Sequence, residues 1–452
     1  MPTTRSQTSQ ATGSTTASSS ENPTANSTTR SRAQLSTQSF TNDVSSPSRR
    51  TLNTGPDHPP RFTINLSLPP SERYHAVCDA LAPEITGLTS LFDEVVGGGI
   101  LPFLPLSLLH WLCWALLRRV YDDEETAELR GISARTGVSV YLLVCFNVLL
   151  DLFMGCSSGG AATEDGMLQF RTLDWGMPAL RRVVVILDFV TEEGGEVVAS
   201  SVTYAGYVGV LTGVRRELSV SLNFRARRDG NGVWGEDVRY ALHLALVVLG
   251  WRRGISSVLM GVVVPKWMER CGGWGWEMGG YRQVVERFGR GGESSTVCYL
   301  CVSDGVQTTV IEKDRVTARM RRSREFIVVT NGDQEDETTD APGPETPLMA
   351  EALQELLHDA RDRKECAENN WHNMRIARLR ETKLSDKSSQ LAPPSLMTTA
   401  DVIALVQKFP TTNECTHYAC VLSALSGDIL WCRRWKRSIS AKWTREHMSE
   451  GW

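Results

Sequence analysis

The sequence predicts an α+β fold in which helices are layered against β-sheets. Short strand patterns separated by turn residues follow Gly155, and they are grouped between apolar helical patterns. The composition fits this class, since 41% of the 452 residues are hydrophobic and 22% are charged. These values are typical of a globular chain with one large domain or two ordinary ones.

Residues 1–58 are expected to form a disordered tail. Nearly half of them are Ser or Thr, and Phe40 is the only aromatic side chain among them. Such a segment cannot bury enough apolar surface to offset the loss of chain entropy on folding. A second tail, basic in character, is expected at residues 436–452.

Residues 59–155 predict a mainly helical region that begins with one strand. The alternation in Arg61–Leu68 is typical of a strand with one buried face. The apolar spacing that follows predicts three helices, at Ser71–Ala82, at 103–119 and at Val138–Met154.

Residues 156–435 predict a larger domain in which strands and helices alternate in groups. The expected strands are Met167–Asp174, Arg182–Phe189, Glu196–Tyr204, Leu218–Phe224, Thr296–Val302, Thr308–Glu312, Phe326–Thr330, Ala419–Ser423 and Ile429–Arg433. The expected helices are Glu236–Met260, Pro347–Arg380 and Ala400–Lys408.

The net charge and the targeting signals limit which partners and which cellular locations are expected. With 48 basic and 52 acidic side chains the net charge is −4, so no nucleic-acid partner is expected. The chain shows no signal-peptide pattern, which favours an intracellular, cytoplasmic location. The apolar run Ile100–Leu117 is near the minimum length for a membrane span, but it contains Pro102, Pro105 and His110, which favour a buried or interfacial helix.

The cysteines do not predict a metal site or a cofactor. Cys298 and Cys301 form a single CxxC in a strand pattern without a second pair. Cys415, His417 and Cys420 are equally poor candidates, although a disulfide within either group is an option in an oxidising compartment.

Cys156 is the candidate nucleophile. A hairpin turning at Glu164-Asp165-Gly166 would bring Arg171 and Asp174 back beside it. An arginine lowers the pKa of a neighbouring thiol, and an aspartate can order a proton acceptor. From the spacing alone, a buried structural cysteine next to an ion pair remains the alternative.

Several motifs, taken together in their order, resemble the acid ceramidase and N-acylethanolamine-hydrolysing acid amidase family, relatives of the choloylglycine hydrolases. They are Arg61-Phe62-Thr63-Ile64-Asn65-Leu66, Glu128-Leu129-Arg130-Gly131, Leu142-Leu143-Val144-Cys145-Phe146-Asn147, Cys156-Ser157-Ser158, Arg171-Thr172-Leu173-Asp174-Trp175, the segment Gly206–Gly213, Trp234-Gly235-Glu236 and Val329-Thr330-Asn331-Gly332-Asp333.

The resemblance implies an αββα sandwich of the N-terminal-nucleophile hydrolase type, with the helical N-terminal subunit packed on it. It further implies a proenzyme that cuts its own backbone before Cys156 and keeps the cleaved subunit as a partner. The new α-amine, which titrates near 7.7–8.0 in model peptides, would then take the proton of the thiol. A lysosome or vacuole is the location that the family suggests.

The resemblance also assigns roles to six residues. Cys156 matches the nucleophile, Arg171 the residue that orients it, and Asp174 the residue that bonds its amine. Asn331 matches the oxyanion donor. Glu236 matches a carboxyl group that lines the site, or it simply begins a helix. Arg363 occupies roughly the place of a late family arginine.

The strand after Cys156 departs from the family pattern. Gly159-Gly160 stand where the family has β-branched residues, and the interval from Cys156 to Arg171 is one residue shorter than usual. A shorter turn would accommodate the deletion, whereas a deletion inside the strand would send every later side chain to the other face.

The implied substrate is an N-acyl lipid, either a ceramide or an N-acylethanolamine, reached through transient contact with a membrane surface. The run 103–117 and the stretch Leu242–Leu249, with Trp111, Trp114 and Trp251, are candidates for that surface. Packing of both helices in the core is the alternative. An acylase or acyltransferase acting on other small amides, and a silent lipid-binding relative, are the competing functions.

Overall fold

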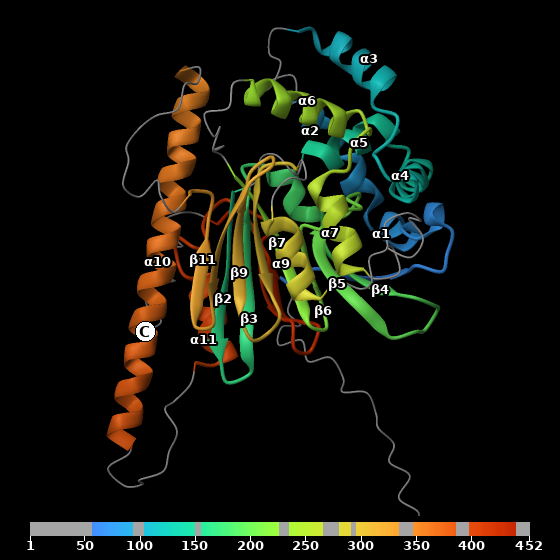
Figure 1. Cartoon of the computed structure of the whole chain (residues 1–452). Coiled ribbons are helices and arrows are strands. Elements are labelled where there is room, and N and C mark those ends of the chain that lie inside the picture. Colours follow the sequence, from blue (N-terminus) through green and yellow to red (C-terminus); the bar gives the residue numbers. More distant parts are fainter. Residues whose placement is uncertain are drawn as a thin grey trace, which may run out of the picture. The chain divides into compact units, whose positions relative to one another are not determined.

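Two β-sheets lie face to face between two layers of helices in the computed structural model (Figure 1). The structure describes residues 57–93, 104–149, 155–225, 235–264, 280–290, 295–333, 347–385 and 397–439, and all of these lie in one compact unit. The predicted αββα sandwich is therefore confirmed. Most of the predicted tails, at 1–58 and 436–452, lie outside the described residues.

The larger sheet has eight strands and includes one strand from the N-terminal region. Its order is β1 (Arg61–Asn65), β4 (Val184–Val190), β5 (Val197–Tyr204), β6 (Thr212–Arg215), β7 (Leu218–Phe224), β8 (Cys298–Ser303), β9 (Thr308–Lys313) and β10 (Ala318–Ser323). β1 pairs with β4 in parallel, and the other neighbours are antiparallel.

The smaller sheet carries the Cys156 hairpin at its centre. Its order is β11 (Phe326–Val329), β2 (Gly155–Thr163), β3 (Gly166–Asp174), β12 (Thr416–Ser423) and β13 (Asp428–Arg434). The register of β2 and β3 runs unbroken from Gly155 opposite Asp174 to Thr163 opposite Gly166. Gly166, with a φ of 97°, closes the predicted turn. The one-residue deletion is thus accommodated without a bulge in either strand.

Helices cover the outer face of each sheet. α10 (Pro347–Ser385) and α11 (Thr399–Gln407) lie against the smaller sheet, and α7 (Ile255–Val263) and α9 (Tyr281–Gly289) lie against the larger one (Figure 1). α10 buries Ala360, Arg363, Ala367, Trp371 and Met374 along one stripe. A capping box between Thr398 and Asp401 begins α11.

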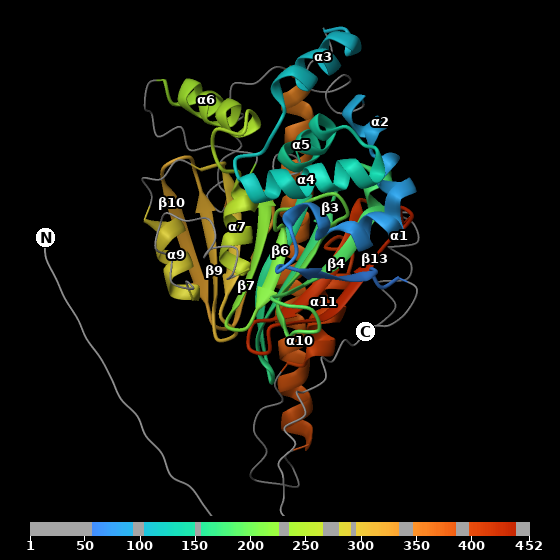
Figure 2. The ribbon, with the colours of Figure 1, turned by 90° about the vertical axis from the view of Figure 1, so that its right-hand side faces the viewer.

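The remaining helices gather at one end of the strands. They are α1 (His75–Thr86), α2 (Thr89–Phe92), α3 (Leu106–Leu116), α4 (Asp123–Thr136), α5 (Val140–Leu149) and α6 (Glu236–Val248). Figure 2 shows α4 and α5 across this end, with α3 beyond them. No helix within the described ranges combines the length and apolar character needed to cross a bilayer.

Two helix predictions need correction, and α4 was not predicted. The block Glu236–Met260 is two helices, because α6 ends at Val248 and Gly250 turns the chain with a φ of 70°. The helix expected at Ser71–Ala82 begins instead at His75, after a 3₁₀ turn at Pro70–Glu72, and continues to Thr86. α4 was not predicted from the apolar pattern because it is largely polar.

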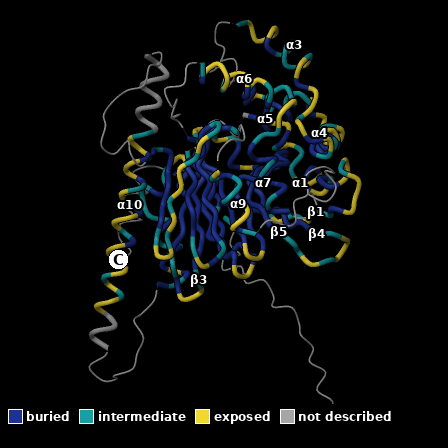
Figure 3. Tube along the Cα trace, in the orientation of Figure 1, coloured by how far each residue is buried: buried dark blue, intermediate teal, exposed yellow. Residues whose placement is uncertain are grey.

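The space between the sheets is buried and partly polar (Figure 3). The Ser158 hydroxyl of β2 donates to Asn223 Oδ1 of β7 over 2.7 Å, and Gln169 of β3 donates to Ser221 Oγ of β7 over 2.9 Å. These hydrogen bonds satisfy the buried polar groups and fix how the two sheets are aligned.

The two glycines after Ser158 belong to this close packing. A Cβ on Gly160 would lie 2.0 Å from Thr308 Oγ1 of the facing sheet, and one on Gly159 would lie 2.5 Å from the Phe170 ring. The departure from the family pattern therefore has a steric cause, since neighbouring side chains fill the volume that β-branched residues would occupy.

Candidate active site

Cys156 is the second residue of β2 and is completely buried. Its backbone N–H donates to Asn331 Oδ1 over 2.9 Å. Its Sγ accepts from Arg171 Nη2 over 3.2 Å and lies 4.0 Å from the Leu222 carbonyl oxygen. The nitrogen of Cys156 therefore bonds to Asn331, and its sulfur accepts a hydrogen bond from Arg171.

Arg171 and Asp174 lie on opposite faces of the smaller sheet. Arg171 is opposite Ser158 in the register, so its side chain shares the face of Cys156 and points toward the larger sheet. Asp174 is opposite Gly155, and its carboxylate points toward α10. The hairpin brings both residues back beside Cys156, with Arg171 on the face of its thiol and Asp174 on the opposite face.

The Arg171 guanidinium is fixed by neutral oxygens and the thiol. Its Nη1 donates to the Leu211 carbonyl oxygen and, over 2.7 Å, to Thr212 Oγ1, which is also 2.9 Å from the Tyr418 hydroxyl. Leu211 and Thr212 belong to the Gly206–Gly213 motif. This motif therefore supports Arg171 through the start of β6.

Arg363 joins the groups on the other face. From α10 its Nη1 donates to Asp174 Oδ2 over 2.9 Å and to Ser157 Oγ over 3.1 Å. Its Nη2 donates to Asn331 Oδ1 over 2.9 Å. The residue with the weakest motif match is thus the one that bridges Asp174 and Asn331.

The orientation of the Asn331 amide follows from its partners. Arginine can only donate a hydrogen bond and a carbonyl oxygen can only accept one. Oδ1 must therefore face Arg363 and the Cys156 N–H, and Nδ2 donates to the Phe224 carbonyl oxygen over 2.8 Å. In this arrangement the residue predicted as the oxyanion donor accepts a hydrogen bond from the Cys156 nitrogen.

Asp174 also accepts hydrogen bonds from two threonines, one of which lies outside the motifs. Thr416 of β12 donates to Oδ1 over 2.6 Å, and Thr172 donates to Oδ2 over 3.3 Å. Burial raises the pKa of the Asp174 carboxyl, and Arg363 and the hydroxyl donors oppose that rise. Nothing in the sequence singles out Thr416, which lies 242 residues away.

The Glu236 carboxylate begins α6 and is bonded elsewhere. It accepts from Arg315 at both oxygens, with Nη2 to Oε2 at 2.8 Å. The hydrogen bonds described above connect the other five predicted residues to one another, whereas Glu236 is joined to Arg315. Its position matches the helix-start interpretation.

The surroundings of Cys156 favour the protonated form of its thiol. Burial raises its pKa above the usual range, and the Arg171 charge counteracts that rise only in part. A thiol of this kind requires a base before it can attack a carbonyl carbon.

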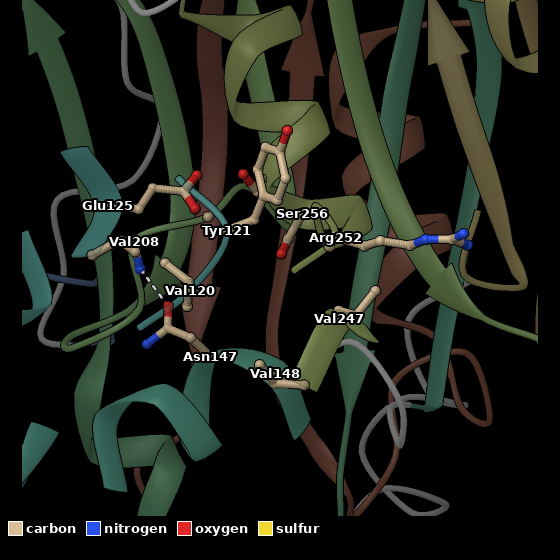
Figure 4. Close-up of a pocket in the computed structure, with 12 residues that line it drawn as sticks. Val120, Tyr121, Glu125, Asn147, Val148, Val208, Val247, Arg252 and Ser256 are labelled. Atoms are coloured by element: carbon tan, nitrogen blue, oxygen red, sulfur yellow. Dashed lines mark hydrogen bonds between the residues drawn. The ribbon is translucent and has the colours of Figure 1, made fainter. Parts of the chain in front are cut away.

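A pocket opens where α4, α5, α6 and α7 meet (Figure 4). Glu125, Arg252 and Ser256 line it together with Val208 and Asn147. Asn147, from a family-like motif of α5, accepts from the Val208 N–H over 2.9 Å and donates to the Gly206 carbonyl oxygen over 2.9 Å. The α5 motif and the Gly206–Gly213 motif are therefore in direct contact.

The described cysteines are free thiols, and the described residues contain no cluster of three or more His, Cys, Asp or Glu arranged to hold a metal ion. Cys298 and Cys301 are three residues apart on β8, so their side chains point to opposite faces. A disulfide between these two is incompatible with this strand.

Comparisons with known proteins agree on one family. Residues 57–121 match the family model of the beta subunit of N-acylethanolamine-hydrolyzing acid amidase. Mouse acid ceramidase is 31% identical over 191 residues, which cover 38% of this chain and 47% of the relative. The Caenorhabditis elegans N-acylethanolamine-hydrolyzing acid amidase is 31% identical over 183 residues, which cover 38% of this chain and 49% of that protein.

The chain spans about half the length of these curated relatives. The structure of a C. elegans N-acylethanolamine-hydrolyzing acid amidase orthologue aligns with a TM-score of 0.40 at 20% identity, covering 64% of this chain and 97% of that one. The sequence matches support the resemblance inferred from the motifs: this chain is similar to the acid ceramidases and the N-acylethanolamine-hydrolysing acid amidases.

Proposed function

We propose that this chain is a self-processed cysteine amidohydrolase of the N-terminal-nucleophile type. It cleaves the amide bond of an N-acyl lipid, a ceramide or an N-acylethanolamine, to a fatty acid and an amine. The observation that carries the proposal is the double hold on Cys156, whose nitrogen is bound by Asn331 and whose sulfur is bound by Arg171. Any buried backbone N–H needs an acceptor, but a structural cysteine does not need a guanidinium at its sulfur.

The first step is a cut between Gly155 and Cys156. Sγ gives up its proton and adds to the carbonyl carbon of Gly155, the bond from that carbon to the Cys156 nitrogen breaks, and that nitrogen takes up the proton. Water then hydrolyses the thioester, which leaves a Gly155 carboxylate and a free α-amine on Cys156. Asn331 Oδ1 already accepts a hydrogen bond from that nitrogen, so the amine is held in place after the cut.

The free amine supplies the base that the buried thiol lacks. An α-amine has a pKa near 7.7–8.0 in model peptides, so it can take the proton from Sγ. The thiolate attacks the amide carbonyl carbon of the lipid, and the tetrahedral intermediate expels the amine with that proton. Water hydrolyses the remaining acyl-thioester to the fatty acid and regenerates the thiol.

The neighbouring charges suit these steps. Arg171 favours the thiolate at Sγ, and Arg363 holds Asp174 and Asn331 at the nitrogen side. The hydrogen bond from Asn331 Nδ2 to Phe224 must be released or shared before that amide can donate to an oxyanion.

We further propose that α3 and α6 contact the membrane that holds the substrate. Leu109 is the buried side chain of α3, while Trp111 and Trp114 are 59% and 53% exposed. Val238 and Leu242 of α6 and Trp251 just beyond it are also exposed. Both helices lie at the same end of the strands in Figures 1 and 2. Exposed tryptophans and leucines at one end match an interfacial surface, and core packing does not describe them.

The experiment that tests the proposed function uses purified full-length protein and its Cys156→Ala variant. The parent protein is expected to release fatty acid from a labelled ceramide or a labelled N-acylethanolamine between acid and neutral pH, and the variant none. Cys432→Ala, which removes another buried thiol of the same sheet, is the matched control and should keep activity. A processed parent that hydrolyses only small amides would indicate an acylase, and one that hydrolyses nothing would indicate a silent lipid-binding relative.

A further inference from the structure

The end of β7 holds the segment that carries Asn331. Asn223 Nδ2 donates to the carbonyl oxygens of Val329 and Thr330, each over 3.3 Å. Asn331 donates to the Phe224 carbonyl oxygen over 2.8 Å. Two consecutive residues of β7 thus make hydrogen bonds with the last residue of β11 and with the two residues that follow it.

The last contact in this series is a buried ion pair. Arg225 Nε donates to Asp333 Oδ1 over 2.7 Å, and its Nη2 donates to Asp333 Oδ2 over 2.5 Å. Arg225 follows directly after Phe224, and Asp333 is two residues beyond Asn331. The forked pair therefore closes the segment immediately after the amide that binds the Cys156 nitrogen.

The surroundings make this pair rigid. Arg225 and Asp333 are 2% and 7% exposed. The Tyr299 hydroxyl donates to Asp333 Oδ1 over 2.6 Å, the Tyr299 ring centroid is 5.8 Å from the Arg225 guanidinium, and Arg225 Nη1 lies 3.4 Å from Asp314 Oδ2. A buried ion pair gives little net stability over apolar packing, because both charges lose their hydration. Its two parallel hydrogen bonds, by contrast, define one geometry.

We propose that Arg225 and Asp333 are positioning residues that fix Asn331 against the Cys156 nitrogen. This inference rests on the proposed function for its catalytic consequence, but the positioning itself is a property of the folded chain. The Asn331 amide is held by Arg363 on one side and by the β7 end on the other. Releasing the second hold lets Oδ1 move away from the nitrogen, and displacements of about 1 Å in such sites cost about 100-fold in rate.

The informative variants are Asp333→Asn and Arg225→Lys. The first keeps the side-chain shape and removes the charge, and the second keeps the charge and removes the fork. Arg73 and Glu128 provide the matched control: Arg73 Nη1 is 2.9 Å from Glu128 Oε1, both side chains are buried, and the pair joins the segment after β1 to α4. Arg73→Lys and Glu128→Gln disturb a comparable pair that makes no contact with Asn331.

The first measurement is hydrogen exchange of the full chain carrying Cys156→Ala, which stays uncut. In this background Asp333→Asn and Arg225→Lys should speed exchange in the peptides containing residue 156 and residues 329–333 by about 10-fold or more. The Arg73 and Glu128 variants should leave the same peptides within about twofold of the parent. Asp333→Asn and Arg225→Lys are called the clamp variants below, because they disturb the pair that holds Asn331. Unchanged exchange at both peptides in the clamp variants would overturn the proposal.

The second measurement is turnover of the processed enzyme. The clamp variants should lose about 10-fold to 100-fold in kcat with KM within about threefold, and the control variants should retain kcat. Normal kcat in the clamp variants of an active parent would overturn the positioning role while leaving the proposed function intact. Faster exchange in the clamp variants of a parent that hydrolyses no N-acyl lipid would support the clamp and contradict the proposed function.

Discussion

Arg363 and Asp174 are 189 residues apart in the sequence, yet Nη1 of the arginine donates to Oδ2 of the aspartate over 2.9 Å. Both side chains are buried, and the same guanidinium reaches Asn331. A single arginine of α10 therefore joins Asp174 to the amide that accepts a hydrogen bond from the Cys156 nitrogen.

Replacing Arg363 with lysine should lower kcat by about 10-fold to 100-fold. A lysine ammonium cannot present the planar fork that serves Asp174 and Asn331 together. The change is measured as steady-state hydrolysis of a labelled N-acyl lipid by processed protein. Arg375→Lys, on an exposed turn of the same helix where Arg375 pairs with Glu325, is the control and should leave kcat unchanged. Equal kcat in Arg363→Lys and the parent would remove Arg363 from the site.

Two substitutions at Asn331 separate its roles as acceptor and donor. Asn331→Ala removes both and should slow turnover roughly 100-fold or more. Asn331→Asp keeps the oxygen that accepts from the Cys156 nitrogen and loses the N–H donor. If the oxygen serves the cut and the N–H serves the oxyanion, Asn331→Asp should be cut before Cys156 and hydrolyse poorly. Cleavage and turnover that fall together in Asn331→Asp would contradict this division.

His417 gives the fold a pH dependence in the acid range. Its Nε2 donates to the Trp175 carbonyl oxygen over 2.9 Å, so Nδ1 accepts from the Tyr204 hydroxyl over 2.8 Å and the ring is neutral. Burial lowers the pKa of His417 to about 3. The unfolded chain therefore binds the proton first as the pH falls below about 6.5.

Between about pH 6.5 and 3, this histidine should lower the free energy of unfolding by up to about 1.4 kcal/mol for each unit of pH decrease. Urea unfolding of the parent and of His417→Asn at a series of pH values measures it, because the difference between the two isolates this group. Parallel pH profiles would show that His417 is not neutral in the folded chain.

The exposed apolar surface of α3 predicts binding to vesicles. Trp111→Ser with Trp114→Ser should lower the partitioning of the protein to phosphatidylcholine vesicles by about 10-fold or more, since two large interfacial side chains are lost. Val306→Ser with Leu425→Ser is the control, because both side chains are about half exposed and lie in the turns that precede β9 and β13. Equal losses in the two double variants would argue against a specific membrane surface.

Local sequence patterns predicted much of the fold. The alternation in β3, β4, β5 and β7 and the turn at Glu164-Asp165 predicted the strands to within a few residues. β6 was missed because four residues are too short to show alternation. α4 is polar, but Asp122 as its N-cap, the three acidic residues that follow and Gly137 at its end are signals that an apolar pattern ignores.

The site was predictable where one hairpin contains it and much less so elsewhere. The two-residue turn brings Arg171 to Cys156, and this follows from spacing. The strand period places Asp174 on the face opposite to Arg171, next to Cys156 in the register. Other contacts of the site join elements that are far apart in the sequence, and no local pattern specifies them. They are the contacts made by Ser157, by Thr416 and by the Arg225–Asp333 pair.

The most direct test of the account is the intact mass of purified protein combined with sequencing of its N-termini. Self-processing before Cys156 should give two fragments, with one new N-terminus that begins Cys156-Ser157-Ser158, and a single uncut chain for Cys156→Ala. A parent that stays uncut under all conditions in which it is folded, or a Cys156→Ala variant that is cut at the same bond, would contradict the assignment of Cys156 as a self-processing nucleophile.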